Sequence, residues 1–121
     1  MSNLHRYADR LFAFVEERDW ARFENPKNLA MALGGECGEL LALLQWRDGE
    51  AAQRELADPR FRREFGYELA DILNYLLRLA RNAEIDIVEV AEEKLAVNER
   101  RYPADKARGN TAKYTELAET E

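Results

Sequence analysis

Cysteine and proline are scarce in this chain of 121 residues. Cys37 is the only cysteine, so the chain cannot form an internal disulfide, as is typical of proteins in the reducing cytoplasm. The only prolines are Pro26, Pro59 and Pro103. The long stretches between them are therefore free to form helices, because an interior proline would break a helix.

Long apolar runs are also missing, since no stretch approaches the roughly 20 residues of a membrane-spanning helix. The first ten residues, MSNLHRYADR, lack the apolar core and the small-residue cleavage site of a signal peptide. We therefore expect a cytoplasmic protein with no membrane partner. The net charge of −6 argues against binding to a nucleic acid polymer, but it allows a small anionic ligand that arrives with a metal ion.

Apolar residues recur at helical spacing along most of the chain, and no strand pattern competes with them. We expect five helices, at about residues 4–18, 26–46, 50–57, 61–82 and 87–101. Asn25 and Asp86 are expected to cap the second and fifth helices. Because the connections are short, the sequence predicts an all-α fold, an antiparallel bundle of four to five helices. Residues 1–103 would form one domain, and residues 104–121 a polar, irregular tail.

Two of the expected helices carry pairs of acidic residues on or beside their apolar faces. Glu36 and Glu39 lie in the segment GGECGELLALLQW, and Glu68 and Asp71 lie in ELADILNYLL. Each pair is three residues apart, so both of its side chains project from nearly the same side of the helix. An isolated ionised carboxylate in an apolar core is normally neutralised, paired or bound to a metal. The four carboxylates predict a site for a hard divalent cation such as Mg²⁺, which prefers oxygen ligands.

The acidic residues and the glycines beside them are also compatible with different arrangements. Arg78 or Arg81 could pair with the carboxylates as buried ion pairs. A di-iron site is disfavoured, because it needs Glu-x-x-His motifs on facing helices and His5 is the only histidine. The glycines at positions 34, 35 and 38 disfavour a helix, so we expect either a ligand close to the backbone or a tight helix crossing there.

The segments NLAMALGGECGELLALLQW, ELADILNYLLRLA and KLAVNERRYP together resemble the MazG-like all-α nucleotide pyrophosphohydrolases. Within that family, RDWARFENPKN and GNTAKYTEL make the chain most similar to the dCTP pyrophosphatase branch. The resemblance implies a Mg²⁺-dependent enzyme, with Mn²⁺ as an alternative. Such an enzyme cleaves a nucleoside triphosphate, here dCTP or a related pyrimidine deoxynucleotide, between the α and β phosphates. The products are the monophosphate and pyrophosphate, and the family forms homodimers and homotetramers.

The resemblance also implies roles for individual residues. The metal ligands would be Glu36, Glu39, Glu68 and Asp71, and the substrate-binding residues would be Trp20, Trp46, Tyr75, Lys94, Asn98 and Arg101. The catalytic residues would be Glu36, Lys94 and Glu39, with Glu39 as the general base. Lys94 and Arg101 are seven residues apart, on one helix face, where they could neutralise the charge of the leaving pyrophosphate.

One residue departs from the pattern of the dCTP pyrophosphatase branch. That branch has a histidine in its first helix, near the place where this chain has Leu11. A hydrolase of broad specificity, or one for non-canonical nucleotides, is therefore an alternative. A second alternative is a non-catalytic helical dimerisation module that senses Mg²⁺ or nucleotide.

Overall fold

The computed structural model describes residues 2–119, and every regular element in them is helical. The α-helices are α1 (Asn3–Glu17), α2 (Pro26–Leu44), α3 (Gly49–Glu55), α4 (Pro59–Asn82), α5 (Ile87–Arg101), α6 (Ala104–Ala107) and α7 (Tyr114–Glu119). A 3₁₀ turn, η1 (Ala21–Phe23), precedes α2. The all-α prediction is confirmed, but the expected count of four to five helices is wrong. The tail contains α6 and α7, which are too short to be recognised from apolar periodicity.

The helix boundaries follow from capping residues in the sequence. The Asn25 side chain accepts a hydrogen bond from the backbone N–H of Asn28 at 2.8 Å, and Pro26 occupies the first position of α2. The Asp86 carboxylate accepts from the N–H groups of Val88 and Glu89 at 3.1 and 3.2 Å, and so begins α5. Both caps expected from the sequence are confirmed.

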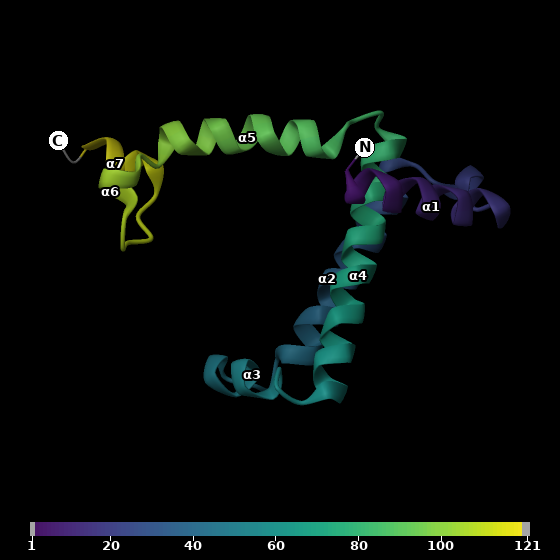
Figure 1. Cartoon of the computed structure of the whole chain (residues 1–121), viewed down its shortest axis with the longest axis horizontal. Coiled ribbons are helices and arrows are strands. Elements are labelled where there is room, and N and C mark those ends of the chain that lie inside the picture. The colour runs from purple at the N-terminus through teal and green to yellow at the C-terminus, as the bar shows by residue number, and fades with distance from the viewer. Residues whose placement is uncertain (1, 120–121) are drawn as a thin grey trace. The chain divides into compact units, whose positions relative to one another are not determined.

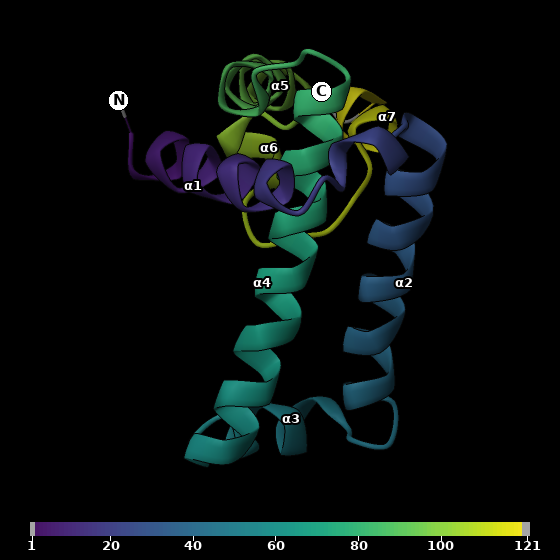
Figure 2. The same cartoon turned by 90° about the vertical axis from the view of Figure 1, so that its right-hand side faces the viewer.

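The chain divides into two compact units, one up to Glu84 and the other from Ile85 onward. In the first unit, α2 and α4 lie side by side and run antiparallel, with α3 between their connected ends (Figures 1 and 2). Helix α1 packs against the C-terminal part of α4. The second unit consists of α5, α6 and α7, with α7 packed against α5.

The apolar side chains that the first unit buries are Ala8, Leu11, Val15, Leu29, Phe61, Leu77 and Ala80. Most of them come from α1 and α4, whose apolar residues recur on one face at helical spacing. Large apolar side chains on α2 and α4 are left exposed, among them Met31, Leu41 and Tyr67. The first unit therefore leaves parts of its two longest helices uncovered. Among residues 2–119, none of the helices combines the length and the apolar composition that a membrane span requires.

Candidate functional site

Three of the four predicted carboxylates come together where α2 packs against α4. Glu36 projects from the middle of α2, and Glu68 and Asp71 project from the middle of α4. One carboxylate oxygen from each of the three lies within 4.8 Å of the other two. We refer to Glu36, Glu68 and Asp71 as the carboxylate cluster. Glu39, one turn further along α2, is exposed and is not part of this group.

The electrostatics of the carboxylate cluster are unfavourable without a cation. Burial raises the pKa of Glu36 above its usual 4.5, and the negative charges of Asp71, Glu68 and Glu39 raise the pKa further. The Oε2 atom of Glu68 is buried and has no hydrogen-bond partner among the described residues. A buried oxygen that accepts no hydrogen bond, beside two other carboxylates, lowers the stability of the folded protein. A bound cation would remove this cost.

The donor set fits a hard divalent cation. Mg²⁺ binds oxygen ligands at about 2.0–2.1 Å, so oxygens on opposite sides of the ion lie about 4.2 Å apart. The 4.8 Å limit of the carboxylate cluster is slightly wider, and small side-chain rotations would close it. All candidate ligand atoms are carboxylate oxygens. Mg²⁺ and Mn²⁺ favour such hard oxygen ligands, whereas softer metals favour sulfur ligands.

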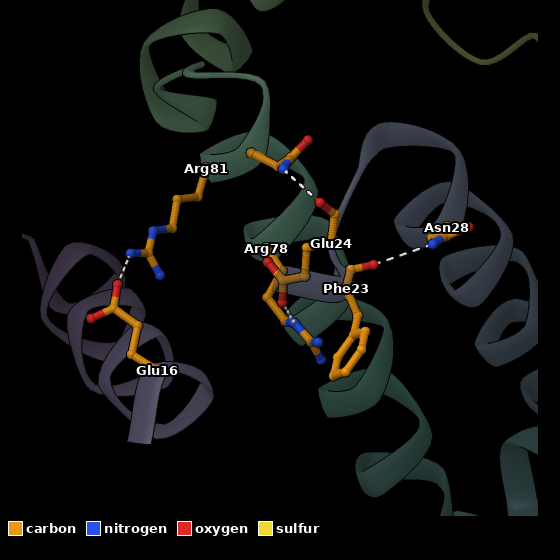
Figure 3. Close-up of polar contacts among 7 residues, drawn as sticks. Glu16, Phe23, Glu24, Asn28, Arg78 and Arg81 are labelled. Atoms are coloured by element: carbon orange, nitrogen blue, oxygen red, sulfur yellow. Dashed lines mark hydrogen bonds and ion pairs between the residues drawn. The ribbon is translucent and has the colours of Figure 1, made fainter. Parts of the chain in front are cut away.

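The two arginines that could have neutralised the carboxylates have other partners (Figure 3). Arg78 Nε donates to Glu24 Oε1 at 2.7 Å, and both side chains are mostly buried. Arg81 forms an ion pair with Glu16 of α1. The alternative that Arg78 or Arg81 pairs with the carboxylate cluster is therefore wrong.

The glycines of α2 do not mark a tight helix crossing within the chain. A Cβ atom built on Gly34, Gly35 or Gly38 would meet no neighbouring atom within 4 Å. These glycines therefore face open space in the single chain. Of the two alternatives that the sequence left open, the intrachain crossing is excluded, and a ligand near the backbone stays a prediction.

The three predicted aromatic residues occupy separate places in the first unit. Trp20 precedes α2 and packs edge-to-face on Phe14, with ring centres 5.6 Å apart. Tyr75 is half-buried on α4, and the guanidinium carbon of Arg78 lies 4.7 Å from the centre of its ring. Trp46 follows the other end of α2 and is 88% exposed. Because the 19 residues of α2 span about 28 Å, Trp20 and Trp46 cannot line one small pocket in a single chain.

The predicted basic and amide residues lie on α5, in the second unit. Lys94 and Arg101 are exposed, and Asn98 is half-buried between them. The guanidinium carbon of Arg101 lies 4.6 Å from the centre of the Tyr114 ring of α7. The structure therefore keeps these three residues on one helix, and their role toward the carboxylates stays a prediction.

A polar network that the sequence did not predict holds the segment between α1 and α2 around Phe23 and Glu24 (Figure 3). Besides the Glu24–Arg78 ion pair, Asn82 Nδ2 donates to the carbonyl oxygen of Glu24 at 3.4 Å. Asn28 Nδ2 donates to the carbonyl oxygen of Phe23 at 3.2 Å. No local spacing could reveal this network, because Glu24 and Arg78 are far apart in the sequence and meet only after the chain folds.

Comparison with known proteins agrees with this arrangement of helices and carboxylates. Residues 33–117, which include α2 from Leu33 onward, all of α4 and the carboxylate cluster, match the MazG-like family. The chain belongs to the MazG-like family. This result confirms the family predicted from the segments NLAMALGGECGELLALLQW, ELADILNYLLRLA and KLAVNERRYP.

Two curated relatives and one solved structure make the relationship more specific. The chain is 46% identical to human dCTP pyrophosphatase 1 over 105 residues, which is 86% of this chain and 61% of the human protein. It is 43% identical to the bovine protein of the same name over 104 residues, 86% of this chain and 62% of the relative. A pyrophosphatase from Archaeoglobus fulgidus superimposes with a TM-score of 0.77 at 36% identity, over 85% of this chain and 94% of the archaeal one. The chain thus spans about three fifths of the length of its curated relatives.

Proposed function

We propose that the protein is a nucleoside triphosphate pyrophosphohydrolase that depends on Mg²⁺ or Mn²⁺. It would hydrolyse the α–β phosphate bond of dCTP or a related pyrimidine deoxynucleotide to the monophosphate and pyrophosphate. The observation that carries the proposal is the carboxylate cluster, with its unpartnered Glu68 oxygen. The names of the mammalian relatives and of the archaeal pyrophosphatase support the reaction.

The carboxylate cluster would hold the cation, with Glu39 joining it from the next turn of α2. When bound, the cation supplies positive charge that offsets the charge of the phosphates and polarises the phosphorus centre. Glu39 is exposed and beside the carboxylate cluster, so it can accept a proton from water as a general base. Lys94 and Arg101 would neutralise the charge that develops on the departing pyrophosphate.

The nucleoside would be held by aromatic residues and by Asn98. Trp20 and Tyr75 offer ring faces on which a base can stack, and Arg78 holds Tyr75 from one side. Trp46 is too far along α2 to join Trp20 in the same chain, so we propose that a second copy brings Trp46 to the pocket. A homodimer or homotetramer would also cover the exposed apolar residues of α2 and α4. We further propose that the protein acts in the cytoplasm.

The decisive experiment is a panel of canonical and modified nucleoside triphosphates with Mg²⁺, in which pyrophosphate, orthophosphate and monophosphate are all measured. We expect pyrophosphate and the monophosphate in equal amounts, with dCTP and related pyrimidine deoxynucleotides as the best substrates. Orthophosphate as the first product would contradict the assigned bond. Equal rates for all bases would favour the hydrolase of broad specificity, and no turnover would favour the sensing module.

The matched variant pair for the panel is Glu39→Gln and Glu17→Gln. Glu17 lies at the end of α1 in an exposed ion pair with Arg18 at 3.7 Å, so its replacement removes the same charge away from the carboxylate cluster. We expect Glu39→Gln to lose at least a hundredfold in kcat, the usual effect of losing a general base, and Glu17→Gln to keep it. Full activity in Glu39→Gln would overturn the role of Glu39.

A further inference from the structure

The ion pair between Glu24 and Arg78 joins the segment before α2 to the C-terminal part of α4 (Figure 3). Its two side chains are only 9% and 13% exposed, whereas those of the neighbouring pair, Glu16 and Arg81, are 56% and 37% exposed. A buried ion pair loses most of its electrostatic gain to desolvation, so an apolar pair of similar shape would often stabilise the fold as well. Stability alone therefore does not account for these two charges.

Arg78 also contacts the ring of Tyr75, one turn earlier on α4. Its guanidinium carbon lies 4.7 Å from the ring centre, within the range of a cation–π contact. Because Glu24 Oε1 accepts a hydrogen bond from Arg78 Nε at 2.7 Å, it fixes the guanidinium against this ring. The carbonyl oxygen of Glu24 is in turn held by Asn82 Nδ2 at 3.4 Å. Glu24 therefore acts on Tyr75 through Arg78.

Tyr75 and Arg78 continue the line of the carboxylate cluster along α4. They follow Asp71 by four and seven residues, so the three side chains project from nearly the same side of the helix. At a rise of 1.5 Å per residue, they lie about 6 and about 10 Å beyond Asp71 along the helix axis. In a nucleotide the sugar separates the base from the phosphates. A nucleotide held by its phosphates at the carboxylate cluster can therefore lay its base against Tyr75.

We propose that Arg78 is a positioning residue for the nucleobase, and that Glu24 positions Arg78. Arg78 supports the Tyr75 ring in the orientation that stacks on a pyrimidine base, so the pair sets the affinity for the nucleoside part of the substrate. The inference rests on the proposed function and deepens it by assigning a role to two residues that touch neither the cation nor the phosphates. Because Glu24 balances the charge of Arg78, the pair does not draw the phosphates away from the carboxylate cluster.

A double variant, Glu24→Gln with Arg78→Met, removes both charges at once and leaves no buried charge without its partner. The matched control is Glu16→Gln with Arg81→Met. It removes an ion pair from the same helix, in which the Arg81 guanidinium carbon lies 4.5 Å from the centre of the Phe12 ring. With dCTP and Mg²⁺, we expect the first variant to raise KM about tenfold, in the range of a lost base–aromatic stack, and to change kcat less than threefold. The control should keep both constants.

Two further measurements separate positioning from a general effect on the fold. Arg78→Lys keeps the charge opposite Glu24 but lacks the planar guanidinium, so KM should rise about threefold with little change in Tm. In a Tyr75→Leu background, the double variant should raise KM no further, because Arg78 acts through the ring that is already absent. Calorimetric titration with dCMP and Mg²⁺ should show binding to the double variant that is about tenfold weaker than to the wild-type protein.

The inference is overturned, with the proposed function intact, if an active wild-type protein and the Glu24→Gln, Arg78→Met variant have the same KM. An equal rise of KM in the Arg81 control, or a full further rise in the Tyr75→Leu background, would also overturn it. Binding of dCMP that weakens in the Arg78 variants, in a wild-type protein that hydrolyses no nucleotide, would instead overturn the proposed function and keep the base site. A wild-type protein that neither binds nor hydrolyses nucleotides would overturn both.

Discussion

Replacing Glu36 by glutamine removes one negative charge from the carboxylate cluster and nearly preserves the shape of the side chain. Two unit charges 4.8 Å apart repel by about 0.9 kcal/mol even at the dielectric constant of water. Glu36 faces both Glu68 and Asp71 at this separation or less, so we expect Glu36→Gln to gain about 2 kcal/mol in free energy of unfolding without metal. For a chain of this size, that gain corresponds to a rise of about 8 °C in Tm.

Thermal unfolding in chelator at pH 7, and again with Mg²⁺, measures the effect. The wild-type protein should gain about 2.7 kcal/mol when Mg²⁺ is present at a hundred times its Kd, whereas Glu36→Gln should gain much less. Glu17→Gln is the matched control on α1, and its exposed ion pair with Arg18 should be worth less than about 1 kcal/mol.

The pH dependence of the same measurement has a defined sign. The pKa of Glu36 in the folded protein is raised above 4.5, so folding favours its protonated form. In chelator, the wild-type protein therefore loses stability as the pH rises from 4.5 through the raised pKa of Glu36, and the advantage of Glu36→Gln grows over that range. A Glu36→Gln protein that is less stable than wild type in chelator at pH 7 would refute the reasoning, as would an undiminished Mg²⁺ effect.

Two further predictions concern the ion pairs of α4 and the exposed end of α2. Arg78→Ala leaves the mostly buried Glu24 without its partner and should lower the free energy of unfolding by about 3 kcal/mol in urea titrations. Arg81→Ala is its control, since the pair with Glu16 is far more exposed and should be worth less than about 1 kcal/mol; equal losses would contradict the distinction. Trp46→Ser should leave the fold unchanged by circular dichroism but lower the molar mass by light scattering, because Trp46 is 88% exposed in the single chain. If the molar mass of Trp46→Ser equals that of the wild-type protein, Trp46 does not hold the copies together.

The first five α-helices could be predicted from the sequence because their signals are local. Apolar periodicity gave their lengths, and Asn25 and Asp86 gave the starts of α2 and α5. The helices α6 and α7 were missed, because four and six residues are too few to show a period. Helix α7 depends instead on tertiary contacts, such as the burial of Leu117.

The candidate site was predictable in part. The acidic pairs on α2 and α4 were recognisable, because a carboxylate on an apolar helix face needs a physical reason. The exclusion of Glu39 from the carboxylate cluster was not recognisable, because it depends on how α2 is rotated against α4. The separation of Trp20 from Trp46 also follows only once the length and direction of α2 are known.

The sequence by itself determined the all-helical class and the family, and it indicated the acidic pairs of α2 and α4 as candidates for a cation site. Each of these follows from residue types at short spacings, which act within one or two helical turns. Only the tertiary structure decided that Glu36 meets Glu68 and Asp71, and that Arg78 pairs with Glu24. These outcomes depend on distances between side chains that come from different helices, and packing alone sets those distances.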